Sequence, residues 1–336
     1  MLEARTQPYI SLPELLRTRL LNDRRNIVVA GTHGKTTTTC MAAVLLQANY
    51  ANPGWLVGGV PRDLPDSSHP GKSGGPFVIE GDEYDTAFFD KRSKFIQYLP
   101  HVLAINNCEF DHADIFRDLD DVLRTFSHVI RLVPRDGAIV ANGDDANVLG
   151  LVQAVTWAPV FRVGTGPGND AVIADFQETA TGSSFTLLWK GREWGRVQWA
   201  LPGLFNARNA AMAAVSAGLL LDRQDPTKLK LAALAKFQGV MRRQQVLVDR
   251  ADRVVIEDFG HHPTALKLTL ESLRARYPQH RLVACFEPRS NTAARKVMQD
   301  AFRDALMLAD DVYLAPAHRA DNPTDNIVNI GEVPPH

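Results

Sequence analysis

The chain has 336 residues, of which 45% are hydrophobic and 22% charged, and its formal net charge is −1. This composition is typical of a globular protein of about two domains, because disordered chains have fewer apolar residues and a larger net charge. The even balance of charge gives no sign of the strongly basic surface that non-specific nucleic-acid binding requires. We therefore expect no nucleic-acid partner.

The chain has no uninterrupted apolar run of the roughly 18 to 20 residues that a membrane helix needs. The first twenty residues contain charges and no apolar block, so they do not resemble a secretion signal. We expect a cytoplasmic protein that does not span a membrane, acts on small molecules and is a monomer or a weak dimer. The three widely spaced cysteines, Cys40, Cys108 and Cys285, each stand beside apolar residues, which predicts buried thiols in a reducing compartment.

Short apolar runs alternate with helical patterns over the first 132 residues. Strands are expected at 27–30, 77–79 and 102–105, and helices at 35–49 and 118–132. This alternation is typical of a parallel sheet covered by helices.

The pattern changes to runs of period two between about residues 138 and 201, for example at 185–189 and 197–201. Such runs, separated by turn residues, predict an antiparallel meander attached to the same domain. Helices are then expected at 206–221 and, after a turn at 224–226, at 227–237.

The last third of the chain returns to alternating strands and helices. Strands are expected at 254–256, 282–286 and 312–315, and helices at 263–276 and 292–308. Three strands joined by two crossover helices predict a Rossmann-like unit.

The most informative segment, residues 31–37, reads Gly-Thr-His-Gly-Lys-Thr-Thr and lies between the first strand and the first helix. A glycine turn at this place points unpaired N–H groups and the positive end of the helix at a phosphate. Lys35 would neutralise the β/γ oxygens, and the Thr36 hydroxyl would ligate Mg²⁺. The loop is shorter than the general Walker pattern, which has glycine where this chain has Val29. We predict that the phosphates of a nucleotide triphosphate are bound by Gly31, Thr32, His33, Gly34, Lys35, Thr36 and Thr37; the alternative is a glycine turn that merely precedes a helix.

Ionisable side chains follow the next two strands. Glu80-Gly-Asp-Glu-Tyr-Asp85 comes after the strand at 77–79, and Asn106-Asn-Cys-Glu-Phe-Asp-His112 after the strand at 102–105. Ligands collect outside the carboxyl ends of parallel strands, so the phosphate loop, Glu80 and His112 are expected to converge. Oxygen and imidazole ligands there would complete a magnesium site. A solvated acidic loop and an unrelated histidine remain the alternatives.

At these residues the sequence resembles the Mur ligase family, the ATP-dependent amide-forming enzymes of peptidoglycan assembly and recycling. The short loop at 31–37 is similar to the phosphate loop of that family, so Val29 no longer counts against nucleotide binding. Three further segments are similar to family elements in the same order: Leu201-Pro-Gly-Leu-Phe-Asn-Ala-Arg-Asn-Ala-Ala211, Gly239-Val-Met-Arg-Arg243 and Asp258-Phe-Gly-His-His-Pro-Thr264. The resemblance covers roughly residues 26–316. It departs at Phe205, where the family usually has histidine.

The resemblance implies a fold class and a division into domains. The fold is α/β, with a P-loop central domain of mostly parallel sheet plus an antiparallel meander, followed by a Rossmann-like C-terminal domain. We expect the central ATP-binding domain at 26–246 and a shortened C-terminal domain at 247–336. Residues 1–25 are expected to be a remnant linker from an N-terminal UDP-binding domain that this sequence lacks.

Within the family, residues 80–95, 110–116 and 286–292 resemble one branch, which joins the recycled tripeptide L-Ala-γ-D-Glu-meso-diaminopimelate to UDP-N-acetylmuramate. In that reaction ATP converts the muramate carboxylate into an acyl phosphate, which the amine of the peptide attacks. The basic run Lys91-Arg-Ser-Lys94 suits an acidic substrate, although it also fits a solvated loop. Ser127 stands where some members carry a carbamylated lysine, which the branch that adds alanine also lacks.

The resemblance and the needs of the chemistry also imply roles for individual residues. Lys35 would hold the phosphates, and Thr36, Glu80 and His112 would ligate Mg²⁺. Because His112 must be neutral to ligate, activity should fall below about pH 6. Arg289 of the C-terminal domain would reach the γ-phosphate when the domains close. Four residues are implied around the rest of the nucleotide: Asn206, Asn209, Arg243 and Asp258. His261 and His262 would lie at the start of the helix that Pro263 opens, rather than form a metal site.

Other functions remain open from the sequence. A related enzyme could add L-alanine, or glutamate to a folate. A shortened paralogue could bind ATP without ligating. A simple P-loop ATPase or kinase would leave the motifs of the second half without a role.

Overall fold

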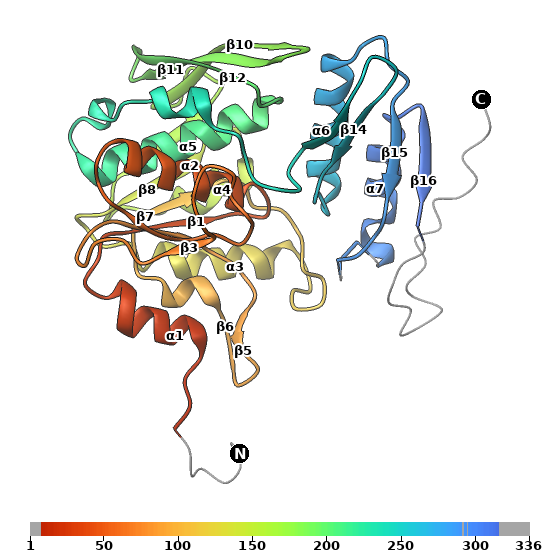
Figure 1. Ribbon diagram of the computed structural model, residues 1–336. Coiled ribbons are helices and arrows are strands. Elements are labelled where there is room, and N and C mark those ends of the chain that lie inside the picture. The colour runs from red at the N-terminus through yellow and green to blue at the C-terminus, as the bar shows by residue number, and fades with distance from the viewer. Residues whose placement is uncertain (1–7, 291, 294, 316–336) are drawn as a thin grey trace.

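The computed structural model describes residues 8–290, 292–293 and 295–315 (Figure 1). Part of the expected linker at 1–25, residue 291 of the 286–292 segment and the end of the expected C-terminal domain lie outside the described residues. The described part of the expected linker contains two short helical turns, α1 (Leu12–Leu16) and η1 (Arg17–Leu21), and the Leu21 side chain is fully buried.

A ten-stranded sheet forms the larger lobe, with the strand order β12-β11-β10-β9-β8-β7-β1-β4-β2-β3. Neighbouring strands from β10 through β2 in that order run parallel, whereas the β10–β11, β11–β12 and β2–β3 pairs are antiparallel. The strands are β1 (Asn26–Ala30), β2 (Gly54–Leu56), β3 (Ser68–His69), β4 (Phe77–Glu80), β7 (Pro100–Ile105), β8 (Ala138–Asn142), β9 (Val160–Gly164), β10 (Ala171–Thr179), β11 (Gly182–Trp189) and β12 (Arg192–Trp199). A separate hairpin joins β5 (Asp85–Ala87) to β6 (Asp90–Ser93).

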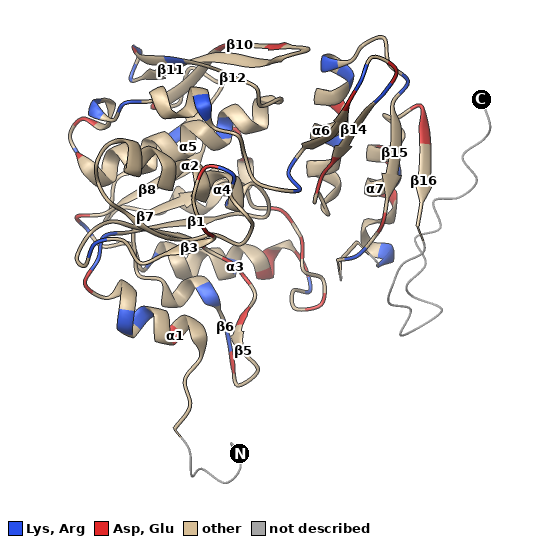
Figure 2. Cartoon of the chain, viewed as in Figure 1, with Lys and Arg blue, Asp and Glu red and all other residues tan. Residues whose placement is uncertain are grey.

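Each face of this sheet has its own apolar core. Successive strand residues point to opposite faces, so Ile27 and Val29 join one core, and Val28 and Ala30 join the other. The first core contains helices α2 (Lys35–Ala48) and α5 (Leu204–Leu221), and the second contains α3 (Leu119–Ile130) and α4 (Ala146–Val152). The result is a three-layer lobe whose central strands carry few charged residues (Figure 2).

Local sequence explains where the helices begin. Asp118 and Asp145 cap α3 and α4, because their side chains accept hydrogen bonds from the N–H groups of Asp121 and Val148. Helix α5 is long and apolar enough to cross a membrane by composition, but 78% of it is buried inside the lobe, as expected of a core helix.

Two predictions about the larger lobe are wrong. The antiparallel meander begins at β10 and not near residue 138, because β8 and β9 continue the parallel part of the sheet with α4 as a crossover. The helix expected at 227–237 is two 3-10 turns, η3 (Pro226–Lys228) and η4 (Ala232–Lys236). The side chain of Asp225 holds the first turn through the N–H group of Thr227.

The second lobe consists of described residues between 245 and 315. Strand β13 (Gln245–Asp249) pairs antiparallel with β14 (Val254–Glu257), and β15 (Val283–Phe286) pairs parallel with β16 (Asp311–Leu314). Helix α6 (Pro263–Arg276) has the predicted bounds, whereas the helix expected at 292–308 is shorter and comprises η5 (Lys296–Met298) and α7 (Gln299–Leu306). Since β13 spans residues 246 and 247, the expected domain boundary falls inside a strand.

The exposed thiol of Cys285 contradicts the expectation that all three cysteines are buried. Ala284 and Phe286 point toward α6 and α7 and are buried, so Cys285 lies on the opposite, uncovered face of β15.

The chain passes between the lobes through residues 239–244, which have unusual backbone angles. Gly239, Arg242 and Gln244 have φ values of 95°, 61° and 47°. The left-handed region is unfavourable for Arg and Gln, so the connection is held by its surroundings. Gln244 is fixed by Asp258, whose carboxylate accepts its N–H group at 2.9 Å.

Candidate active site

The phosphate loop joins β1 to α2, as predicted. Gly31 and Gly34 have φ values of 140° and 79°, and Gly34 is the N-cap residue of α2. A Cβ atom on Gly34 would lie 2.6 Å from the Oδ1 atom of Asn209, so glycine is required there for space and for backbone angle. The loop therefore leaves the N-terminus of α2 accessible to an anion.

Lys35 lies at the centre of this loop. Its Nζ atom donates to the Gly31 and Thr32 carbonyls at 2.6 and 3.3 Å and pairs with the Glu83 carboxylate at 3.1 Å. Burial opposes its charge, but Glu83, Glu80 and Asp82 outweigh that cost and raise the pKa of Lys35. The ammonium group remains charged at neutral pH.

Thr36 and Glu80 meet as the sequence predicted. The Thr36 hydroxyl donates to Oε1 of Glu80 at 3.0 Å, and the other carboxylate oxygen accepts the Gly58 N–H group at 2.8 Å. Parallel pairing of β1 with β4 brings the two strand ends side by side, so the contact follows from topology.

His112 lies in the same region, but its partner is Glu83. The imidazole Nε2 atom is 3.0 Å from Oε1 of Glu83, and His112 adopts a left-handed φ of 55°. Asp82, Glu83 and His112 place one ligand atom each within 4.8 Å of one another. Sequence reasoning named Glu80 and missed Glu83, although Glu83 lies three residues further along the same acidic segment.

Asp111 provides a further unsatisfied group beside this cluster. Its buried Oδ2 atom has no hydrogen-bond partner among the residues that the structure describes, and it lies 3.9 Å from Nε2 of His112 and 3.8 Å from Nε2 of His261. An unpaired buried carboxylate oxygen is costly, and a cation or donor in the cavity would satisfy it. The carboxylates of Asp82, Glu83 and Asp111 supply the oxygen ligands that Mg²⁺ prefers, with the imidazole of His112 beside them.

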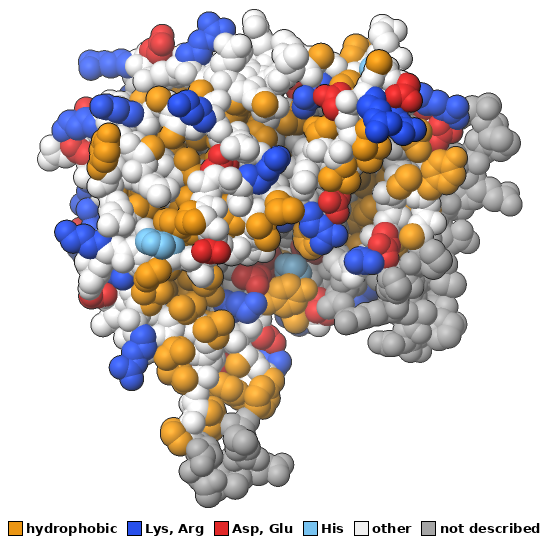
Figure 3. Space-filling model, viewed as in Figure 1, with side chains coloured by type: hydrophobic (Ala, Val, Ile, Leu, Met, Phe, Trp, Pro, Cys, Tyr) orange, Lys and Arg blue, Asp and Glu red, His pale blue; other side chains and the backbone are white. Residues whose placement is uncertain are grey.

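A cavity of about 690 Å³ opens over these groups, and we call it the acceptor cavity. Acidic, basic and histidine side chains gather in a hollow on this face of the molecule (Figure 3). Its lining includes Lys35, Thr36, Glu80, His112 and an apolar wall from α1.

The basic run 91–94 divides between two environments. Lys94 lines the acceptor cavity, where it pairs with Asp82 at 2.7 Å and lies over the Tyr84 ring. Lys91 is 71% exposed, pairs with Asp85 and lies outside that cavity. Of the three basic residues in this run, only Lys94 therefore lines the cavity beside the phosphate loop.

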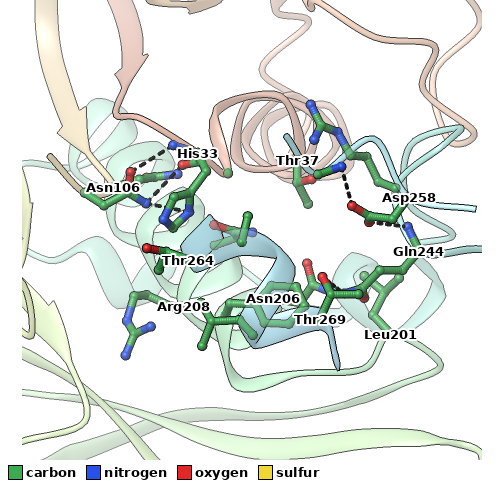
Figure 4. Close-up of a pocket in the computed structure, with 18 of the residues that line it drawn as sticks. His33, Thr37, Asn106, Leu201, Asn206, Arg208, Gln244, Asp258, Thr264 and Thr269 are labelled. Atoms are coloured by element: carbon green, nitrogen blue, oxygen red, sulfur yellow. Dashed lines mark hydrogen bonds between the residues drawn. The ribbon is translucent and has the colours of Figure 1, made fainter. Parts of the chain in front are cut away.

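A second cavity of about 350 Å³ lies on the other side of the phosphate loop, and we call it the nucleotide cavity. Its walls come from both lobes, with His33 and Asn206 from the larger lobe and Thr264 and Thr269 from α6 (Figure 4). Four residues that the sequence implied around the nucleotide line it: Asn206, Asn209, Arg243 and Asp258. Phe205 also lines this cavity.

Arg289 is not brought to either cavity. It is 66% exposed and pairs with Glu287 at 2.9 Å. Arg289 would contact a γ-phosphate only after a movement of the second lobe, so this contact stays a prediction.

The histidines before α6 point in different directions, as expected. His262 caps the helix, because its Nδ1 atom accepts the Thr264 N–H group, and its Nε2 atom lies 3.2 Å from the Phe110 carbonyl oxygen. His261 faces Asp111 instead. Burial lowers the pKa of both rings, so both are neutral near pH 7.

Comparison with known protein families assigns both lobes. Residues 29–217 match the Mur ligase middle domain, and residues 242–332 match the Mur ligase glutamate ligase domain.

The chain is also similar to individual proteins. It is 40% identical over 93% of its length to the UDP-N-acetylmuramate–L-alanyl-γ-D-glutamyl-meso-2,6-diaminoheptandioate ligase of Escherichia coli, covering 67% of that protein. It is 33% identical over 92% of its length to the UDP-N-acetylmuramate–L-alanine ligase of Desulfitobacterium hafniense, covering 65% of it. A murein peptide ligase structure from Psychrobacter arcticus superposes with a TM-score of 0.70 at 35% identity, over 94% of this chain and 68% of that one. The chain thus spans about two thirds of the length of these relatives, and it belongs to the Mur ligase family of ATP-dependent, amide-forming enzymes.

Proposed function

We propose that this chain uses ATP to join the tripeptide L-Ala-γ-D-Glu-meso-diaminopimelate to UDP-N-acetylmuramate in the cytoplasm. The observation that carries the proposal is the position of the phosphate loop between two cavities of different character. The acceptor cavity contains charged groups beside Lys35, and the nucleotide cavity contains amide and hydroxyl groups from both lobes. An enzyme that activates a carboxylate with ATP needs both spaces to meet at the transferred phosphate.

We assign the nucleotide to the 350 Å³ cavity and its phosphates to residues 31–37. The N-terminus of α2 and the charged Lys35 would neutralise the β/γ oxygens as charge develops on them. Asn206 and Asn209 would face the base, and Arg243 and Asp258 would approach it from the junction of the lobes. Arg289 would add a planar cation over the γ-phosphate after closure.

The acceptor cavity fits Mg²⁺, which would supply charge neutralisation between ATP and the carboxylate. Thr36 and Glu80 would hold one ion, and His112 with Glu83 or Asp82 would hold a second. The residues of the cavity would orient the muramate carboxylate beside the γ-phosphate, so that the amine of the peptide reaches the acyl phosphate from the open side. The peptide specificity rests on similarity to the Escherichia coli ligase that its name describes.

We also propose that the ATP-binding domain begins near residue 26 and ends at the left-handed connection just before β13, close to the expected residue 246, and that a mobile C-terminal domain follows. The left-handed residues at 239–244 and the neighbouring strand β13 support a boundary in this region.

A substrate panel tests the proposed function. The chain is incubated with ATP, Mg²⁺ and UDP-N-acetylmuramate together with the tripeptide, L-alanine or L-glutamate. We expect ADP release and an amide product, detected by mass spectrometry, with the tripeptide. Greater turnover with L-alanine would assign the alanine-adding reaction. Binding of an ATP analogue without product from any acceptor would identify a chain that binds nucleotide without ligating.

A further inference from the structure

The carboxylate of Glu109 connects the phosphate loop to the second lobe. Glu109 lies four residues beyond β7, and its two oxygens contact different partners. Oε1 lies 2.9 Å from Nε2 of His33 in the phosphate loop, and Oε2 accepts the Thr264 hydroxyl of α6. One side chain therefore spans the gap between the two walls of the nucleotide cavity.

The loop side of this connection is fixed at several atoms. The Thr32 hydroxyl accepts the Glu109 N–H group at 2.8 Å, and the His33 N–H group donates to Oδ1 of Asn107 at 2.9 Å. The Asn107 amide nitrogen lies 2.9 Å from Nδ1 of His33, which leaves Nε2 to donate to Glu109. His33 lines both cavities, so its position affects the space on each side of the loop.

The second-lobe side begins at the first turn of α6. Thr264 and Glu109 both line the nucleotide cavity, and Figure 4 shows His33 and Thr264 close together at one end of it. His262 lies beside the same carboxylate, with Nδ1 3.6 Å from Oε2, but that nitrogen accepts the Thr264 N–H group and does not donate to Glu109.

The environment keeps Glu109 ionised. Burial opposes its charge, but the hydrogen bond from His33 and the nearby His262 and Thr264 outweigh this and lower the pKa of Glu109 to about 2. Hydrogen bonds to a charged acceptor are stronger than those between neutral groups.

We propose that Glu109 is a positioning residue for ATP, which sets the distance between the phosphate loop and the start of α6 through His33 and Thr264. This inference rests on the proposed ATP site. A nucleotide that contacts both walls gains affinity when their spacing is fixed before it binds. Nucleotide affinity should therefore depend on Glu109 even though the residues of the phosphate loop remain unchanged.

The chain offers a matched control in Glu178, which also joins the lobes but lies outside both cavities. Oε1 of Glu178 accepts the Gly203 N–H group at 2.9 Å and the Ser272 hydroxyl at 2.6 Å. Replacing Glu178 by Gln weakens a contact between the lobes without altering the phosphate loop.

The test compares Glu109→Gln and Glu178→Gln in the full chain by titration calorimetry with a non-hydrolysable ATP analogue and Mg²⁺. We expect Glu109→Gln to weaken binding about 10-fold, the loss expected for a hydrogen-bonded charge. Glu178→Gln should stay within about twofold of the unaltered chain, because fixing the nucleotide walls does not involve it. Equal analogue affinity in the unaltered chain and Glu109→Gln, or equal losses in both variants, would overturn the proposal.

Two further measurements distinguish failure of this proposal from misfolding of the variant and from failure of the proposed function. If the circular dichroism spectrum shows that Glu109→Gln is not folded, the test uses Thr264→Val instead. We expect this variant to bind the analogue several-fold more weakly than the unaltered chain. Combining Thr264→Val with Glu109→Gln should add little to the loss, because both break the same connection; additive losses would contradict it. If the unaltered chain fails to bind the analogue, the proposed function fails. If the unaltered chain binds it and Glu109→Gln binds it equally well, only this inference fails.

Discussion

The two cavities beside the phosphate loop are built in different ways. In the acceptor cavity, the contacts of Glu83 with Lys35 and His112 and of Glu80 with Thr36 are all made within the larger lobe, although residues 259–262 of the second lobe also line that cavity. The nucleotide cavity is lined by α5 and the phosphate loop from the larger lobe and by the start of α6 from the second. The difference teaches that the contacts among the charged groups are made within one lobe, whereas the walls of both cavities depend on how the two lobes are held.

The largest effect should come from removing the charge of the phosphate loop, which faces the acceptor cavity. Lys35→Ala should reduce turnover by about 10² or more, because preorganised charge at the transferred phosphate is lost. The measurement is ADP release at saturating ATP, with Lys91→Ala as a control for an exposed lysine. Near-normal turnover in Lys35→Ala would remove this residue from the mechanism and weaken the distinction between the cavities.

A smaller effect should be confined to the acceptor cavity. Lys94→Ala should raise the KM for UDP-N-acetylmuramate about 10-fold while leaving the KM for ATP nearly unchanged, since only an ammonium group facing that cavity is removed. Lys91→Ala should change neither value, because Lys91 is exposed and paired elsewhere. Equal changes in the two KM values for Lys94→Ala would show that the cavities are not independent.

The smallest effect concerns how the stability of the metal-free protein depends on pH, through the groups beside the acceptor cavity. Burial lowers the pKa of His112, but Glu83 and Asp111 outweigh it and raise that pKa above its usual value. A raised pKa means that protonated His112 stabilises the fold at pH values below about 6.5, and that this contribution is lost as pH rises through the folded-state pKa.

Thermal unfolding in EDTA should detect this effect. The difference in Tm between the unaltered chain and Glu83→Gln should be about 2 °C larger at pH 5.5 than at pH 8. The same proton must leave before His112 ligates a metal, so activity should fall on the acid side, as the sequence predicted. A Tm difference independent of pH would contradict the pairing.

Features fixed by local chemistry were predictable from the sequence. The glycine turn before Lys35 and the parallel order of β1, β4 and β7 were sufficient to bring Thr36, Glu80 and His112 to one edge of the sheet. Proline at the first position of α6 gave that helix its start.

Features that depend on the path of a loop were not predictable. Glu80 and Glu83 lie in one acidic segment, and only the folded turn shows that the second meets Lys35 and His112. Arg289 has the charge that a phosphate site needs, yet it pairs with Glu287 two residues away, and its distance from the phosphate loop depends on the orientation of the second lobe. The role of Glu109 was missed for the same reason, because Thr264 lies 155 residues later in the chain.

The left-handed residues between the lobes have a consequence for closure around a substrate. Backbone conformations of this kind cost about 1–3 kcal/mol each, so Arg242 and Gln244 hold energy that a rotation of a few dihedral angles would release. A rotation of the second lobe that moved Arg242 and Gln244 into commoner backbone regions would release this strain and reduce the work that substrate binding has to supply.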